Sequence, residues 1–369
     1  MKDKFFKHFT TILNNSPPER GGIFADGVSP PTCRPKPWRR RKPKGQRMGV
    51  GYPTICIAVS GGADSICLTH LISEYAKKNN VKLIAVTVDH QLRPEAKDEA
   101  EFVHKFCTDL GIYHETLVWK HGEIKSDIEN KARIARYDLI KEFARKNKAS
   151  IILTAHHQDD QIETFLMNLS RGSGIYGLSG MKEMSILNSP LGRGRTKSYL
   201  CDEDGVGLIL VRPLLQFSKQ EILDYCKENK LSFINDSMNE DETFTRVKIR
   251  KNRHLMSEKL GITDDKIILA INNLSRIRQH LECAVALHLE ECEVQQNVYD
   301  LEKFMRADDE IILRSLSLIL MEVSGSPFGP TLEKLENLKS SIEKGELPKT
   351  LGGVKIFSKS THLIFQKLK

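Results

Sequence analysis

The clearest feature of the hydrophobic and polar pattern is an apolar run that breaks into glycines and then resumes as a helix. Residues Ile55 to Val59 are apolar and predict a buried strand. Ser60, Gly61 and Gly62 interrupt this run, and the segment from Ala63 to Ala76 has the pattern of a helix. A strand, a glycine turn and a helix N-terminus are therefore expected in direct succession.

The same alternation continues as far as residue 214. A nearly continuous apolar run predicts a strand at 82–88, and further strands are expected at 113–119, 150–155 and 209–214. Helical periodicity predicts helices between them, at about 95–110, 126–148 and 158–170. Strands that alternate with helices imply an α/β fold with a doubly wound, mostly parallel sheet. Ligands of such sheets bind beyond the carboxyl ends of the strands.

The segments on either side of this alternation differ in composition. The stretch before it is rich in Pro, Gly and Arg, and the stretch after it is mainly helical, with Ser218 and Glu221 spaced as a capping box. We predict an N-terminal helix (1–15), a flexible basic insert (16–51), a sheet domain (52–217, with a second flexible insert at 187–205), a smaller, mainly α-helical domain (218–345) and a small C-terminal β hairpin (346–369).

The formal net charge of +8 has a local source. Residues 34–47 hold eight Lys or Arg and no acid, so the rest of the chain is near neutral and net charge alone argues weakly for RNA binding. No apolar run is long enough to span a membrane, and the eight cysteines form no C-x-x-C or zinc spacing. We expect a reduced cytoplasmic protein without a membrane partner, and its assembly, a homodimer included, stays open.

The glycine turn predicts an anion site. Two adjacent glycines let backbone N–H groups crowd around one centre, and the helix dipole adds positive potential there. No Gly-Lys-Ser/Thr follows, which excludes the P-loop of kinase-like NTPases. Asp64 stands in the first helical turn instead, where a carboxylate beside bound phosphates suits Mg²⁺ between them. The alternative is that Ser60 and Asp64 only cap the helix.

Polar residues also lie at the end of the second strand and on the long helix. Asp89 and His90 end the strand, where they either meet a nucleotide or its metal or are simply solvated. Arg136 falls on the apolar stripe of the helix at 126–148. A guanidinium there needs an anionic partner, which is either a ligand phosphate or an acid in a structural salt bridge.

Two carboxylates open the helix at 158–170. Asp160 and Glu163 are one turn apart, and we expect them to stand together away from the apolar stripe. Because the preceding strand ends in His156 and His157, the pair is predicted to face a cationic substrate or a metal. A complement to the helix dipole is the alternative.

Six ordered motifs in residues 55–250 resemble those of the tRNA(Ile)-lysidine synthetase family, within the PP-loop ATP pyrophosphatase superfamily. The motif at residues 60–65 is shared across the superfamily, and the ordered set of all six motifs is specific to the family. In two places the chain departs from the family pattern, since Ala96 replaces a serine and Val247 an asparagine. The motifs are Ser60-Gly-Gly-Ala-Asp-Ser65, Val88-Asp-His-Gln-Leu-Arg93, Ala132-Arg-Ile-Ala-Arg-Tyr137, Thr154-Ala-His-His-Gln-Asp-Asp-Gln-Ile-Glu-Thr164, Arg171-Gly-Ser-Gly with Gly177-Leu-Ser-Gly-Met181, and Arg212-Pro-Leu-Leu215.

The resemblance implies a ligase that uses ATP and Mg²⁺ to adenylate C2 of the wobble cytidine in the CAU anticodon of tRNA(Ile). Free L-lysine then attacks C2 through its ε-amine, leaving lysidine, AMP and pyrophosphate. The helical domain would recognise the tRNA, and Asp160 and Glu163 would bind lysine. The implied nucleotide-binding residues are Ser60, Gly61, Gly62, Ala63, Asp64, Ser65, Asp89 and His90, with Asp64 near the metal. The implied catalytic residues are Asp64, Arg136, His156, Asp160 and Glu163.

Two other functions compete with this interpretation. A related PP-loop enzyme that thiolates tRNA would need cysteines for sulfur relay or an iron–sulfur cluster, commonly as C-x-x-C, and this chain has none. A non-catalytic RNA-binding module would be expected to have lost a carboxylate or a loop residue, but Asp64, Asp160 and Glu163 are all present.

Overall fold

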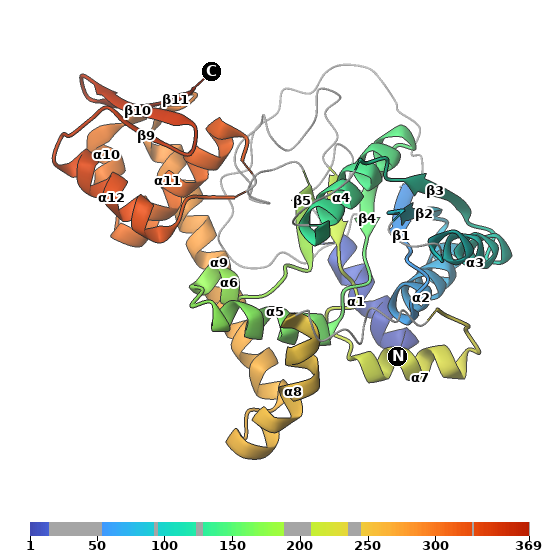
Figure 1. The fold of residues 1–369 in the computed structure, drawn as a ribbon. Coiled ribbons are helices and arrows are strands. Elements are labelled where there is room, and N and C mark those ends of the chain that lie inside the picture. The colour runs from blue at the N-terminus through green and yellow to red at the C-terminus, as the bar shows by residue number, and fades with distance from the viewer. Residues whose placement is uncertain are drawn as a thin grey trace. The chain divides into compact units, whose positions relative to one another are not determined.

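The computed structural model describes residues 1–14, 54–91, 95–122, 128–187, 208–234, 245–326 and 328–368. Contacts divide these residues into a first unit, which ends at Leu274, and a second unit, which begins at Ser275 (Figure 1). The predicted insert at 16–51 lies outside the described residues, as does the insert at 187–205 apart from Leu187. The predicted helical segment at 218–345 is divided between the two units, and the predicted domain boundaries stay predictions.

A six-stranded sheet lies at the centre of the first unit, in the order β3-β2-β1-β4-β6-β5. The first five strands in that order are parallel to their neighbours, and β5 is an antiparallel edge strand. The prediction of a mostly parallel sheet is therefore confirmed. Strand β5 was not predicted, because an edge strand of four residues is too short to show a hydrophobic periodicity. The strands are β1 (Thr54–Ala58), β2 (Lys82–Asp89), β3 (Tyr113–Val118), β4 (Ala149–Leu153), β5 (Met184–Leu187) and β6 (Leu208–Val211).

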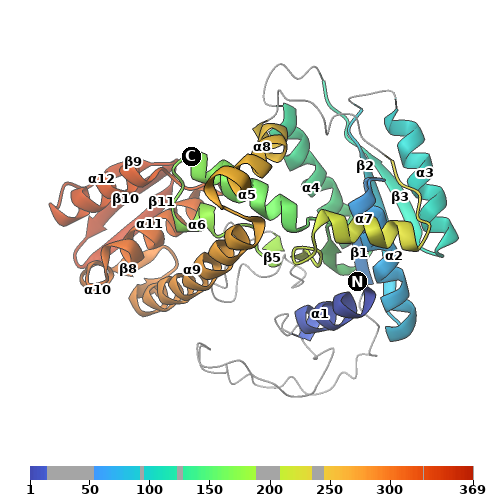
Figure 2. The same ribbon diagram turned by 90° about the horizontal axis from the view of Figure 1, so that it is seen from below.

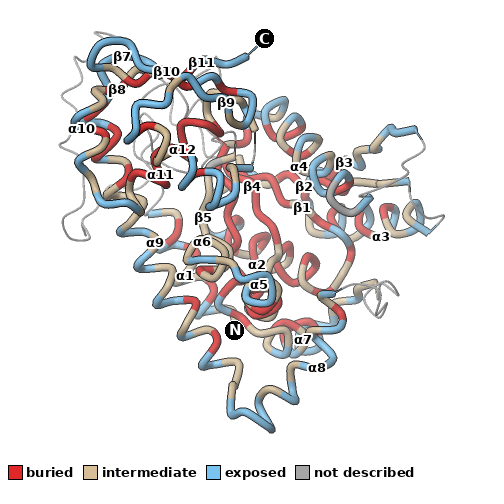
Figure 3. The backbone as a smooth tube through the Cα atoms, turned by 60° about the vertical axis from the view of Figure 1, so that its left-hand side comes forward, coloured by how far each residue is buried: buried red, intermediate tan, exposed pale blue. Residues whose placement is uncertain are grey.

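Helices cover both faces of this sheet, which explains why its central strands β1, β4 and β6 are mainly apolar, whereas the edge strand β3 is partly exposed. On β1, Ile55 and Ile57 belong to a core cluster with residues of α2, while Cys56 between them faces a cluster with residues of α4 (Figure 3). The helices are α1 (Lys2–Asn14), α2 (Ala63–Asn79), α3 (Ala96–Asp109), α4 (Ile128–Lys146), α5 (Gln158–Ser170), α6 (Ile175–Leu178), α7 (Lys219–Glu228), α8 (Thr245–Leu260) and α9 (Asp264–Cys292), which continues into the second unit.

Helix α8 follows the sheet and packs beside α5 (Figure 2). Its sequence is dominated by basic residues, so periodicity did not reveal it, and Val247 is its one fully buried side chain. A small apolar cluster joins α5 to the start of α9 through Ile162, Leu166, Ile267 and Ile271. This packing brings the basic residues of α8 to the acidic first turns of α5.

The second unit has its own core and an antiparallel sheet of five strands in the order β7-β8-β11-β10-β9. The predicted C-terminal hairpin is present as β10 and β11, but it forms the middle of this larger sheet. None of the helices described is both long and apolar enough to cross a bilayer. The remaining elements are β7 (Glu293–Gln295), β8 (Val298–Asp300), α10 (Leu301–Met305), α11 (Asp309–Ser324), α12 (Leu332–Glu343), β9 (Lys349–Leu351), β10 (Val354–Lys359) and β11 (His362–Lys367).

Candidate active site

The glycine turn after β1 depends on glycine at position 61. Gly61 has a φ of +87°, in the left-handed region that side chains avoid. A Cβ at this position would lie 2.8 Å from Cδ1 of Ile234, whose own N–H donates a 2.9 Å hydrogen bond to the Gly61 carbonyl. The left-handed conformation therefore favours glycine, and an added Cβ would also have to displace the end of the Ile234 side chain.

Serine hydroxyls close the turn without capping α2. Ser65 Oγ accepts a 3.1 Å hydrogen bond from the backbone N–H of Ser60 and donates one of 3.0 Å to the carbonyl of Gly62. Gly62 is the N-cap of α2, and no side chain caps it among the described contacts. The capping alternative for Ser60 and Asp64 is therefore wrong, and the first amides of α2 are left for another acceptor.

His157 joins this turn to the start of α5. Its Nδ1 accepts a 3.2 Å hydrogen bond from the Asp159 N–H, so the ring proton resides on Nε2. Nε2 lies 3.7 Å from Oδ2 of Asp64 and 3.6 Å from Oδ2 of Asp160. Asp160 also accepts a 3.0 Å hydrogen bond from the His157 N–H, which completes a capping box. Asp160 is thus the N3 member of the capping box at the start of α5, and the imidazole of the N-cap His157 lies between it and Asp64 of the glycine turn.

Lys219 was not expected at this site. It is the first residue of α7, and its Nζ lies 2.7 Å from Oδ1 of Asp64. Its backbone N–H donates a 3.1 Å hydrogen bond to Oδ1 of Asp159. A signal was present in the sequence, because a lysine in the first turn of a helix opposes the helix dipole.

Glu163 lies one helical turn after Asp160 and faces α8, where Arg250 interacts with both carboxylates. Its side chain is fully buried between α5 and α8, with Nε of Arg250 2.7 Å from Oε1 and Nε of Arg246 3.1 Å from Oε2. The apolar contacts of α5 bring α8 over this face, and the carboxylate can be buried only because two guanidinium groups meet it. The cations that face Glu163 in this structure are therefore two arginines of the same chain.

The other α8 arginine near the site, Arg253, reaches the first turn of α5. Its NH2 group lies 2.9 Å from Oδ2 of Asp159 and 3.1 Å from Oδ2 of Asp264. Burial raises the pKa of Asp159, but hydrogen bonds from Lys219 and Arg253 outweigh it and lower that pKa overall. Asp159 therefore connects α5, α7 and α8.

Arg136 has an exposed surface, yet burial lowers the pKa of its guanidinium, so its place on the core-facing stripe stays a prediction. The fully buried side chains of α4 gather mainly in its second half, and Nε of Arg136 donates a 3.1 Å hydrogen bond to Nε2 of His90. Burial, followed by the charge of Arg136, lowers the pKa of His90 to about 4, so its imidazole is neutral at pH 7. The described contacts join these two residues to each other and not to Asp64 or Glu163.

His156 and Asp89 both end strands of the sheet. Nδ1 of His156 lies 3.0 Å from the Thr154 hydroxyl, and burial, reinforced by Arg212, lowers the pKa of His156 to about 4. The imidazole is therefore neutral at pH 7 and a weak base. Oδ1 of Asp89 accepts a 2.7 Å hydrogen bond from the N–H of Gln91 and so stabilises the chain as it leaves β2.

A family model described as the PP-loop domain matches residues 41–257. The tRNA(Ile)-lysidine synthase of Wolbachia pipientis wMel is 36% identical over 313 residues, which cover 82% of this chain and 68% of that protein. The enzyme of that name from Rickettsia bellii (strain OSU 85-389) is 31% identical over 310 residues, covering 83% and 67%. The chain belongs to the tRNA(Ile)-lysidine synthase family.

Membership accounts for the glycine turn, since a PP-loop domain binds ATP. Among solved structures, the U34-tRNA thiolase NcsA from Methanococcus maripaludis, with its [4Fe-4S] cluster, overlays at a TM-score of 0.48 with 17% identity, covering 62% of this chain and 73% of that one. That likeness is too slight to bear on function.

In this lysidine synthase family member, burial raises the pKa of Cys56 and of Cys107 to about 12, so both stay protonated thiols at pH 7.

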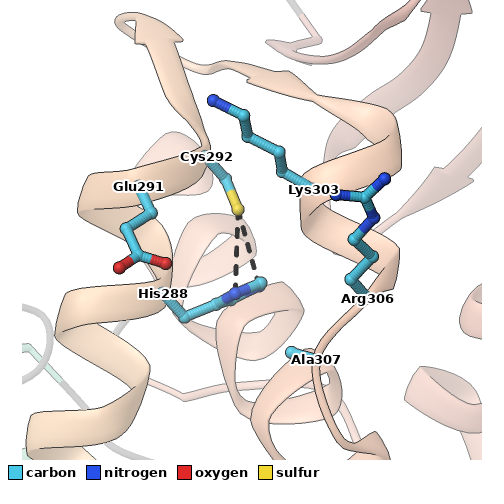
Figure 4. Close-up of a pocket in the computed structure, with 6 residues that line it drawn as sticks. All are labelled: His288, Glu291, Cys292, Lys303, Arg306 and Ala307. Carbon is cyan, nitrogen blue, oxygen red and sulfur yellow. Dashed lines mark hydrogen bonds between the residues drawn. The ribbon is translucent and has the colours of Figure 1, made fainter.

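A hollow of about 460 Å³ lies elsewhere, in the second unit. Its lining residues are His288, Glu291, Cys292, Lys303, Arg306 and Ala307 (Figure 4). Sγ of Cys292 lies 3.7 Å from Nδ1 of His288, and burial raises the pKa of this thiol to about 11. The thiol is therefore neither a nucleophile nor a ready metal ligand at pH 7. The residues that line this hollow include none from the glycine turn or from α5.

Proposed function

We propose that this chain ligates L-lysine to C2 of the wobble cytidine in the CAU anticodon of tRNA(Ile), through an adenylated cytidine and with release of pyrophosphate and AMP. One observation carries the proposal. The Nε2–H of His157 lies 3.7 Å from Asp64 and 3.6 Å from Asp160, so the phosphate-binding turn and the acidic start of α5 share one imidazole. A nucleotide held at the turn would have its α-phosphate close to an acceptor held at α5.

On the nucleotide side, Ser60 to Ser65 would bind the phosphates through the uncapped amides of α2. Asp89 and His90, at the end of the neighbouring strand, would contact the nucleoside. Mg²⁺ usually takes one or two carboxylates together with substrate phosphates and water. Asp64 supplies such a carboxylate, and the described residues contain no group of three potential metal ligands, which fits a metal held largely by ATP. Bound Mg²⁺ would neutralise phosphate charge.

On the acceptor side, Asp160 and Glu163 would bind the lysine ammonium groups. Glu163 already holds two guanidinium groups, so its surroundings accept cations. Arg246 and Arg250 keep 41% and 43% of their side chains exposed, and can therefore move aside for lysine. Free lysine has a pKa of about 10.4 and must lose a proton before it attacks, and the carboxylates that hold its amine would accept that proton.

The tRNA would approach from the side of α8 and Arg136. Arg136 is exposed beside the neutral His90, and its cation would stabilise the negative charge on the α-phosphate of the adenylated cytidine. The homodimer stays a prediction, which light scattering of the active protein tests.

Incorporation of labelled lysine into a CAU-anticodon isoleucine tRNA transcript tests the function. We expect tRNA-dependent conversion of ATP to AMP and pyrophosphate, lysine in the tRNA product, and neither with a methionine tRNA as the control. ATP turnover without lysine incorporation would contradict the proposal. A sulfur-dependent mass change in the tRNA would favour thiolation, and RNA binding without turnover would favour a non-catalytic module.

A further inference from the structure

The position of Lys219 is locally unfavourable. It is the first residue of α7, behind the N-cap Ser218, where the helix dipole favours acids and disfavours cations. Glu221 in the same turn satisfies that preference and completes the capping box, so Lys219 adds nothing to the start of the helix. Positions that break a local rule without a local gain are commonly functional.

The side chain of Lys219 reaches the phosphate-binding turn. Its Nζ donates a 2.7 Å hydrogen bond to Oδ1 of Asp64, in the first turn of α2, although the two residues are 155 positions apart in sequence. Nε2–H of His157 approaches the other oxygen of the same carboxylate at 3.7 Å. The Asp64 carboxylate is thus an anion surrounded by an ammonium, an imidazole N–H and the start of a helix.

A bound phosphate, which is also an anion, would be stabilised by the same ammonium, imidazole N–H and helix N-terminus. In P-loop NTPases a lysine inside the loop contacts the β- and γ-phosphates, but residues 60–65 of this chain contain no lysine. Lys219 brings an ammonium to the same turn from a distant helix. Its main chain is held by the 3.1 Å hydrogen bond to Asp159, while 38% of its side chain is exposed and free to turn.

We propose that Lys219 is a phosphate-binding residue of the active site, which Asp64 holds in place until ATP binds. The inference rests on the proposed cleavage of ATP between its α- and β-phosphates. The bond from the cytidine O2 to the α-phosphorus forms, the bond from that phosphorus to the bridging oxygen breaks, and its electron pair leaves with pyrophosphate. Lys219 keeps its proton and donates hydrogen bonds to the departing pyrophosphate, which gains negative charge in that step.

Binding of ATP and of AMP to the purified full chain, without tRNA or lysine, tests this directly. For Lys219→Met we expect the Kd of Mg·ATP to rise about 10-fold or more, as for loss of a charged hydrogen bond, and the Kd of AMP to change less than about 2-fold. AMP lacks the phosphates that Lys219 would contact. Lys219→Arg should restore most of the ATP affinity, and Lys227→Met, the same change at an exposed position of α7, should leave it intact.

A second measurement separates phosphate binding from support of Asp64. In an Asp64→Asn background, Lys219→Met should still weaken ATP and pyrophosphate binding. No further loss in that background, or an equal loss of ATP and AMP affinity, would overturn the proposal. Thermal unfolding of each variant shows whether it is folded. If Lys219→Met is unfolded, the ATP affinities of Lys219→Arg and Lys219→Gln are compared instead, and only the charged variant should keep most of the affinity. ATP affinity is measured without the tRNA reaction, so a failure here is distinct from a failure of the proposed function.

Discussion

Nε of Arg250 lies 2.7 Å from Oε1 of Glu163, so a partly exposed cation of α8 closes over a carboxylate that is fully buried in α5. This hydrogen bond raises the pKa of Arg250, which means that Glu163 stabilises the charged guanidinium. Any other cation that uses Glu163 has to share it with this arginine or displace it. The pair therefore couples the position of α8 to the lysine site that we propose.

The first prediction concerns Glu163→Gln, which keeps the shape of the side chain but removes its charge. We expect lysine transfer from a preformed adenylated tRNA to fall by about 100-fold or more, as for loss of a general-base or ionic contact, while adenylation changes less than about 5-fold. Single-turnover assays of the two half-reactions measure both values. Glu142→Gln makes the same change at an exposed position of α4 and serves as the control. Equal losses in both steps would show that Glu163 does not act on lysine.

Gly61→Ala should damage the glycine turn. A left-handed conformation costs a non-glycine residue about 1–2 kcal/mol, and the new Cβ would also press on Ile234. We expect a lower free energy of unfolding in urea and a higher Kd for ATP. Gly62→Ala is the matched control for stability, because Gly62 has a φ of −71° and its nearest neighbouring atom lies 3.9 Å from the added Cβ. Equal stability of the two variants would contradict the prediction.

The pH dependence of stability should include a contribution from His114, which is buried on β3 beside Thr87 and His104. Burial, followed by the charge of His104 and opposed by Glu115, lowers the pKa of His114 from 6.5 to about 4. Between these values the unfolded chain binds more protons than the folded one. The resulting stabilisation is present above pH 6.5 and is lost as the pH falls toward 4.

His114→Asn removes that titration. Between pH 6.5 and 4 we expect the free energy of unfolding to change less steeply in the variant, by up to about 1.4 kcal/mol per pH unit. Urea unfolding at several pH values measures the slope, which is independent of any constant loss caused by the substitution. An unchanged slope would mean that His114 is protonated in the folded state.

Helix α1 should be part of the folded core. Phe9 is fully buried, with its ring centroid 5.0 Å from that of Tyr75 on α2. Phe9→Ala should therefore cost about 3–5 kcal/mol of stability, the range for a large core side chain. Phe6→Ala removes a partly buried ring from the same helix and should cost clearly less. Equal and small losses would show that α1 is not docked in solution.

The sequence by itself determined the elements whose pattern is local. Apolar runs identified the strands that are buried on both faces, the spacing of Ser218 and Glu221 identified the start of α7, and Ser60 to Ser65 identified the glycine turn between β1 and α2. Short edge strands such as β5 have too few residues to carry a period, and α8 is too basic to display one. Those elements form because neighbouring parts of the fold supply their partners.

Only the tertiary structure decided which charges meet. Glu163 and Arg250 are 87 positions apart and Asp64 and Lys219 are 155 apart, so no local pattern predicts either contact. They form because the strand order and the packing of α7 and α8 bring these side chains to the carboxyl end of the sheet. There a buried carboxylate is stable only beside a cation, and burial decides which histidines remain neutral.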